Sequence, residues 1–181
     1  LRMFNRSFVC YNVQGIHGNV LLREAIAKSC DIYFYEAGWR TSPETIAAEA
    51  RRFHLDQRTG IELPSETSRM LIPEPAWKLR ARGDKWQPGD TANMAIGQGD
   101  VLVTPLGMAC FAASVARGEI FTKPTLVHQP GRIAQHTEPI GLTAAQRAAL
   151  FDGMEGCTTT GTAKVLATIE DYRVPGVRIA G

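Results

Sequence analysis

The sequence has little that would mark a membrane-spanning, disordered or nucleic-acid-binding protein. It contains no apolar run near the ~20 residues of a membrane-spanning helix and no signal-peptide pattern at its start. The net charge is only +2, and the loose basic group between Lys78 and Lys85 lacks interleaved aromatic residues, which argues against a nucleic-acid partner. Because 44% of the residues are hydrophobic and 21% are charged, the composition also excludes disorder. A globular chain of 181 residues remains, long enough for one domain with a sizeable core.

Cysteine is scarce and follows no pattern. The four cysteines (Cys10, Cys30, Cys110 and Cys157) form no Cys-x-x-Cys pair and no dense framework, so they favour neither an oxidising nor a reducing compartment. We expect Cys110 in the core, and Cys157 has no evident partner. The chain opens on Leu1-Arg2-Met3 without an initiator methionine at position 1, which indicates a piece of a longer protein.

Residues 15–31 hold the densest group of chemically active side chains. A Gly-rich turn is followed by apolar residues at helical spacing, which predicts a helix over residues 19–29. The end of this helix brings the hydroxyl of Ser29, the thiol of Cys30 and the carboxylate of Asp31 within about one turn of each other. A catalytic site and an ordinary junction between two helices are both consistent with this group, because Ser and Asp favour such junctions.

The rest of the chain predicts a mostly helical protein. Ser42 or Thr41, Thr104 and Thr143 are placed as N-caps, and Gly38 as the stop of a helix that follows Asp31. Pro and Gly punctuate residues 58–76, which predicts an ordered excursion rather than a helix. The predicted helices cover residues 32–37, 43–53, 106–116 and 144 to 151 or 154, the helix at 106–116 being deeply buried, and extended segments are predicted at 119–140 and 174–181.

Several short motifs occur in an order that resembles a known family. They are His17-Gly18, Ser29-Cys30-Asp31 with Tyr33-Phe34-Tyr35, Thr59–Glu66, Trp86–Thr91, Gly97-Gln98-Gly99 with Val103–Leu106, and Gly161-Thr162-Ala163. Over nearly the whole chain they resemble the transpeptidase domain of class B penicillin-binding proteins, closest to the elongation-type penicillin-binding protein 2 group. The resemblance implies an α/β penicillin-binding transpeptidase fold (serine β-lactamase-like). This chain would hold mainly its α-helical subdomain, with parts of the central antiparallel sheet.

Two of the three active-site motifs of penicillin-recognising serine enzymes are missing. Such enzymes use Ser-x-x-Lys, Ser-x-Asn or Ser-x-Asp, and Lys-Thr-Gly or Lys-Ser-Gly. Only the second is present, as Ser29-Cys30-Asp31. In the family the third motif usually follows Val-x-x-Ala-Gly, and the chain stops at Val177–Gly181. We therefore expect residues 1–181 to be a single partial domain between the first and third motifs, without the nucleophile and unable to form an acyl-enzyme.

The resemblance implies peptidoglycan D,D-transpeptidation through a serine acyl-enzyme, with peptidoglycan stem peptides as substrates and β-lactam antibiotics as inhibitors. In that scheme Ser29 passes a proton toward the leaving group, and Asp31 orients substrate amides and the lysine of the first motif. Trp86 and Gln98 are the candidate substrate-binding residues, with a packing anchor and a tight turn as their respective alternatives. Partners in the cell-elongation machinery, a membrane anchor in a preceding segment and a periplasmic or extracytoplasmic location are also implied.

His17, Cys30 and Cys10 are candidate metal ligands, although acyl transfer itself requires no cofactor. Some elongation-type relatives carry zinc beside the second motif, bound by a His, the middle residue of Ser-Cys-Asp and upstream aspartates. The spacing from His17 to Cys30 fits that arrangement, whereas the aspartates are missing and Cys10 is the only nearby substitute. Zinc prefers four ligands and three are on offer, so buried thiols with a hydrogen-bonded His are the alternative to a structural zinc.

Two other functions stay open from the sequence. A β-lactam sensor or a β-lactamase of the class D kind would use the same chemistry, but the spacing of Gly-Gln-Gly and Thr-Pro-Leu argues against it. A non-catalytic helical binding module is the other, because two of the three motifs are missing. A Ser-x-x-Lys upstream in the parent gene would exclude that module.

Overall fold

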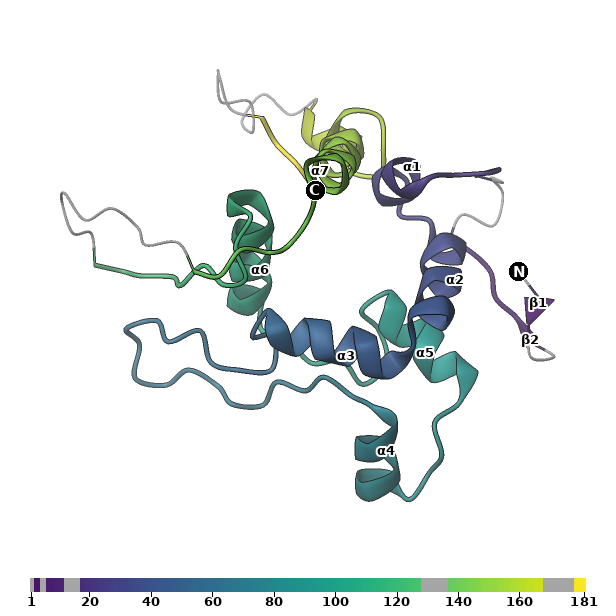
Figure 1. Cartoon of the computed structure of the whole chain (residues 1–181), viewed down its shortest axis with the longest axis horizontal. Coiled ribbons are helices and arrows are strands. Elements are labelled where there is room, and N and C mark those ends of the chain that lie inside the picture. The colour runs from purple at the N-terminus through teal and green to yellow at the C-terminus, as the bar shows by residue number, and fades with distance from the viewer. Residues whose placement is uncertain (1, 4–5, 12–16, 128–136, 168–177) are drawn as a thin grey trace. The chain divides into compact units, whose positions relative to one another are not determined.

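The computed structural model describes residues 2–3, 6–11, 17–127, 137–167 and 178–181 (Figure 1). It divides the chain into two compact units. The first unit comprises Leu1–Ala37 and Leu142–Gly181, and the second unit is Gly38–Gly141. The elements are the strands β1 (Arg2–Met3) and β2 (Arg6–Ser7), the helices α1 (Leu22–Ala27), α2 (Asp31–Thr41), α3 (Pro43–Arg52), α4 (Pro75–Arg82), α5 (Pro88–Ala95), α6 (Pro105–Arg117) and α7 (Ala144–Thr159), and the 3-10 helix η1 (Lys164–Ala167).

The described residues are mainly helical, as predicted. Strand structure among them is limited to the antiparallel pair β1–β2 and two isolated bridges, Leu71 to Leu102 and Glu119 to Pro139. Residues 128–136 and 174–177 of the predicted extended segments lie outside the described residues. No helix in the described part of the chain has both the length and the apolar character to cross a bilayer. The single partial domain stays a prediction.

Three helix starts follow the predicted capping chemistry. The Ser42 hydroxyl accepts the Thr45 N–H at 3.3 Å before α3, and the Thr104 hydroxyl accepts the Gly107 N–H at 2.9 Å before α6. Thr143 caps α7 by accepting from the Gln146 N–H. Each cap satisfies a backbone donor that the helix itself leaves unpaired, which is why Ser and Thr are favoured there. These caps are confirmed, but α6 is buried along one side only, because Met108 is 42% exposed.

Gly38 does not end α2, which continues to Thr41. A Cβ at Gly38 would lie 2.5 Å from the Cβ of Ala95 in α5, so glycine is required for the close approach of these helices. The Trp39 indole N–H also donates to the Pro88 carbonyl at 2.9 Å. The predicted stop at Gly38 is therefore wrong, because a packing contact rather than a left-handed turn selects this glycine.

The second unit has a small apolar core. Its buried members are Ala47, Ile72 and Met94, and Trp86 is among the half-buried residues that pack against them. The predicted excursion at residues 58–76 is held by Glu66, whose carboxylate accepts the Thr59 N–H at 2.5 Å and the Gly60 N–H at 3.0 Å. These backbone donors lower the pKa of Glu66.

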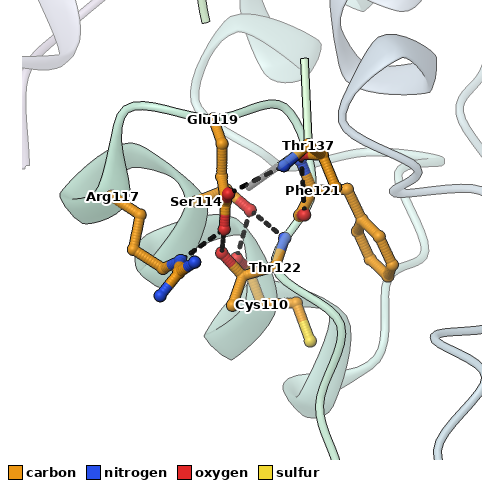
Figure 2. A network of polar contacts seen from close by, with 7 residues as sticks. All are labelled: Cys110, Ser114, Arg117, Glu119, Phe121, Thr122 and Thr137. Carbon is orange, nitrogen blue, oxygen red and sulfur yellow. Dashed lines mark hydrogen bonds and ion pairs between the residues drawn. The ribbon is translucent and has the colours of Figure 1, made fainter. Parts of the chain in front are cut away.

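A buried carboxylate joins the end of α6 to the segments after it (Figure 2). Glu119 is 2% exposed, and its Oε1 accepts from Arg117 Nε and from the Thr122 hydroxyl at 2.6 Å. Its Oε2 accepts the Thr137 N–H at 3.0 Å, while the Thr122 N–H donates to the Ser114 hydroxyl at 2.8 Å. The hydrogen bond from Arg117, followed by those from the two threonines, lowers the pKa of Glu119 to about 2. The carboxylate is therefore charged and fully paired at neutral pH.

In the first unit, α1 packs along α7. Gly153 and Gly156 of α7 face Ile26 and Ala27 of α1, where added methyl groups would lie about 3 Å from those side chains. The helix α1 is shorter than the predicted 19–29, because Leu21 in an extended conformation precedes it and Ser29 has a positive φ just after it. This pairing places the C-terminal end of α1 beside the segment that follows α7.

Candidate functional site

The turn between α1 and α2 carries the candidate catalytic pair. Ser29 has φ 49°, a left-handed conformation that is uncommon for a residue with a side chain. The Ser29 N–H donates to Ile26 O at 3.1 Å and the Cys30 N–H to Ala25 O at 2.9 Å, so the last turn of α1 holds this geometry. The turn leaves the Ser29 side chain exposed and buries Cys30, which is 5% exposed. Backbone strain of this kind clusters at functional sites.

Asp31 is the first residue of α2 and is held from outside the helix. Its Oδ2 accepts the Tyr11 N–H at 2.8 Å, and the Tyr11 hydroxyl donates to the Lys28 carbonyl at 3.0 Å. A carboxylate at a helix N-terminus is also favoured by the helix dipole. The hydrogen bond from Tyr11 uses one of the two carboxylate oxygens of Asp31.

The segment after α7 lies against the end of α1. The Thr162 N–H donates to the Ala27 carbonyl at 3.1 Å. A Cβ on Gly161 would lie 1.9 Å from the same carbonyl oxygen, so only glycine permits this approach. The Thr162 hydroxyl then lies 3.2 Å from Ser29 Oγ and 3.3 Å from Cys157 Sγ. In the sequence, the only signal for Thr162 is its place in the Gly161-Thr162-Ala163 motif.

Cys10, His17 and Cys30, the ligand set that the resemblance implied, lie together. One ligand atom from each lies within 4.8 Å of the others, and Cys10 Sγ is 3.9 Å from His17 Nδ1. Tetrahedral zinc, with bonds of about 2.3 Å to sulfur and about 2.0 Å to nitrogen, separates its ligand atoms by roughly 3.5–3.8 Å. Two thiols and an imidazole are suitable zinc ligands, so the donor types and spacing fit a metal with one further ligand.

Trp86 and Gln98 belong to the second unit, whereas Ser29, Cys30 and Asp31 belong to the first. The indole N–H of Trp86 donates to the Thr91 hydroxyl at 2.8 Å and its ring packs on the core of the second unit, so packing accounts for its contacts. Gln98 is exposed between two glycines with positive φ, and its N–H donates to Asn93 O at 2.8 Å. Substrate binding by these two residues stays a prediction.

Comparisons with known proteins agree on one family. The family described as "Penicillin binding protein transpeptidase domain" matches residues 3–181. The Peptidoglycan D,D-transpeptidase MrdA of Acinetobacter baumannii is 42% identical over 100 residues, which are 55% of this chain and 15% of that protein. MrdA of Salmonella typhimurium is 30% identical over 130 residues, which are 71% of this chain and 21% of that protein. This chain thus spans about a fifth or less of these curated relatives.

Solved structures agree with the sequence comparisons. The complex between penicillin-binding protein PBP2 and MreC from Helicobacter pylori matches with a TM-score of 0.82 and 30% identity, covering 99% of this chain and 33% of that one. PBP2 of Pseudomonas aeruginosa, solved with WCK 5153, matches with a TM-score of 0.80 and 27% identity, covering 94% of this chain and 40% of that one.

Proposed function

This chain belongs to the penicillin-binding protein transpeptidase domain family, and from that premise we propose that it is the part of a peptidoglycan D,D-transpeptidase that carries the second active-site motif. The observation that carries the proposal is the turn at Ser29-Cys30-Asp31, which exposes one hydroxyl beside a carboxylate held in place by Tyr11. Relatives that are D,D-transpeptidases support this function over a β-lactam sensor or a non-catalytic module.

The proposed reaction is acyl transfer between stem peptides. A serine in a Ser-x-x-Lys motif, which this chain does not contain, attacks the carbonyl of the penultimate D-Ala, and the terminal D-Ala leaves as an amine. The Ser29 hydroxyl passes the proton that this amine needs, and the Asp31 carboxylate accepts a hydrogen bond from the lysine or a substrate amide. An amine of a neighbouring stem peptide then displaces the serine, while a β-lactam leaves the serine acylated.

Fluorescent penicillin labelling tests the proposal. We expect the complete protein to be labelled, residues 1–181 alone to remain unlabelled, and Ser29→Ala to slow acylation by about 10²-fold or more, the usual contribution of a proton-transferring group. Ser68→Ala, at an exposed position of the second unit, is the matched control and should acylate at the unchanged rate. Equal acylation rates for Ser29→Ala and the unaltered protein would remove Ser29 from the mechanism.

A structural zinc ion bound by Cys10, His17 and Cys30 is part of the proposal. The clustered donor atoms support it. Zinc bound there would fix the Cys30 side chain and thereby the turn that presents Ser29 and Asp31. Elemental analysis of protein purified without chelator should give one zinc per chain, and His17→Ala should lose it, whereas Cys110→Ala in α6 should retain it. Zinc content near zero in the unaltered protein would leave buried thiols and a hydrogen-bonded His as the account of this cluster.

We infer the cellular setting of the complete protein from its relatives. PBP2 from Helicobacter pylori forms a complex with MreC, which supports a partner in the cell-elongation machinery for the complete protein. We place the protein in the bacterial cell envelope, anchored in the cytoplasmic membrane by a segment before residue 1, with this domain on the outer side. Chemical cross-linking in cells should capture the MreC of the same organism. Cross-linked products that lack MreC would contradict the proposal that MreC is a partner.

A further inference from the structure

The Ser29 hydroxyl needs a defined direction to transfer a proton. A serine hydroxyl rotates about its C–O bond and carries one proton and two acceptor lone pairs. The side chain is exposed, so packing does not restrict it, and the partner that the structure gives its Oγ is the Thr162 hydroxyl at 3.2 Å. The two residues are 133 positions apart in the sequence. This contact therefore exists only because the fold brings the segment after α7 to the end of α1.

Thr162 is itself rigidly placed. Its N–H is bonded to Ala27 O, and the neighbouring Ala163 N–H donates to Cys157 O at 3.0 Å. Gly161 permits the backbone to come against Ala27. The backbone at Thr162 is thus held by main-chain contacts on both sides, whereas its side chain is exposed and fills no core. Removing its hydroxyl should change little except the contact with Ser29 and Cys157.

The hydrogen bonds around Thr162 have a favoured direction. Its Oγ1 lies between Ser29 Oγ and Cys157 Sγ, and its single proton can serve only one of them. Sulfur is a weak acceptor, so the threonine proton is directed to the serine oxygen and the thiol S–H donates to threonine. With one of its two lone pairs occupied by Thr162, Ser29 keeps its own proton available for a different acceptor, such as an atom of the substrate.

We propose that Thr162 is a positioning residue for Ser29, and that the chain of hydrogen bonds from Cys157 through Thr162 to Ser29 sets the direction of the Ser29 proton. This inference rests on the proposed role of Ser29 in acyl transfer. In this role Thr162 makes and breaks no bond itself. It acts by keeping one rotamer of Ser29 populated before the substrate arrives, and misplacement of a reacting group is costly to catalysis.

The test measures the second-order rate constant of acylation by fluorescent penicillin in the complete protein. Thr162→Val keeps the shape and removes the hydroxyl, and we expect a loss of about tenfold to hundredfold. Thr162→Ser restores the hydroxyl and should acylate within about threefold of the unaltered protein. Both variants should melt within a few degrees of it; Thr162→Ala is the second hydroxyl-free variant should Val fail to fold. Equal losses in the Val and Ser variants, or no loss in Val, would overturn the inference.

A double variant separates this inference from the proposed function. In the Ser29→Ala background, Thr162→Val should produce no further loss, because its only route to the reaction is through Ser29. If Ser29→Ala alone leaves acylation unchanged, the proposed function of Ser29 fails. If Ser29→Ala slows acylation but Thr162→Val acylates normally, only the positioning role fails. An additive loss in the double variant would mean that Thr162 acts elsewhere.

Discussion

Replacing Glu119 by glutamine should loosen the end of α6 at neutral pH but not in acid. The fold lowers the pKa of this carboxyl from 4.5 to about 2. At about 1.4 kcal/mol per pKa unit, the difference corresponds to about 3 kcal/mol in favour of the charged folded form. This stabilisation is complete above pH 4.5 and is lost as the pH falls through 2, because the unfolded carboxyl takes up its proton first. Glutamine retains one oxygen and presents an N–H group to donors, so we expect about 2–3 kcal/mol of destabilisation at pH 7.

Hydrogen exchange at the amides of Ile120, Thr122 and Thr137 measures this effect, because it reports the free energy of local opening. Each variant is compared with the unaltered protein at the same pH. At pH 7 exchange in Glu119→Gln should be about 30- to 150-fold faster, and near pH 2 the ratio should shrink to a few-fold. Glu138→Gln, an exposed neighbour, is the matched control. A ratio that is equally large at both pH values would refute the electrostatic reasoning.

Two further perturbations follow from single contacts. Gly161→Ala would drive a methyl group to 1.9 Å from the Ala27 carbonyl oxygen. The backbone must separate, so the melting temperature of the first unit and penicillin acylation should both fall. Gly83→Ala, which is strained by a φ of 72° but has open space around it, should spare acylation. Thr104→Ala removes the acceptor of the Gly107 N–H and should lower the free energy of unfolding, measured by urea denaturation, by about 1 kcal/mol. Acylation should not change, and a loss of acylation would contradict the purely structural role of Thr104.

Local features of this chain could be predicted from its sequence, and contacts between distant segments could not. The caps at Ser42, Thr104 and Thr143 depend on a side chain and a backbone N–H three residues on, so the sequence contains the whole interaction. The helix stop predicted at Gly38 was wrong, because glycine is required there by its close contact with Ala95, which lies in another helix. The sequence showed only a glycine near the end of a helix, and a helix stop is the usual local reason for such a glycine.

In the candidate site, too, contacts between distant segments could not be predicted from local patterns. Cys10, His17 and Cys30 were grouped through the resemblance to zinc-carrying relatives, and the structure brings their donor atoms together. Thr162 was visible only as a member of a motif, because its contact with Ser29 depends on the pairing of α1 with α7. Arg117 and Thr122 are local donors to Glu119, whereas the hydrogen bond from Thr137, 18 positions away in the sequence, was absent from any local pattern.

The discontinuous first unit has a consequence for the order of folding. The helix α1 ends at Ala27 and its partner α7 begins at Ala144, with the second unit encoded between them. At about 5–20 residues per second, a ribosome needs on the order of ten seconds to synthesise that interval. The second unit can collapse on its own contacts during this time, while the short α1 has no partner for its apolar side. The contact between Ser29 and Thr162 is therefore completed late in biosynthesis.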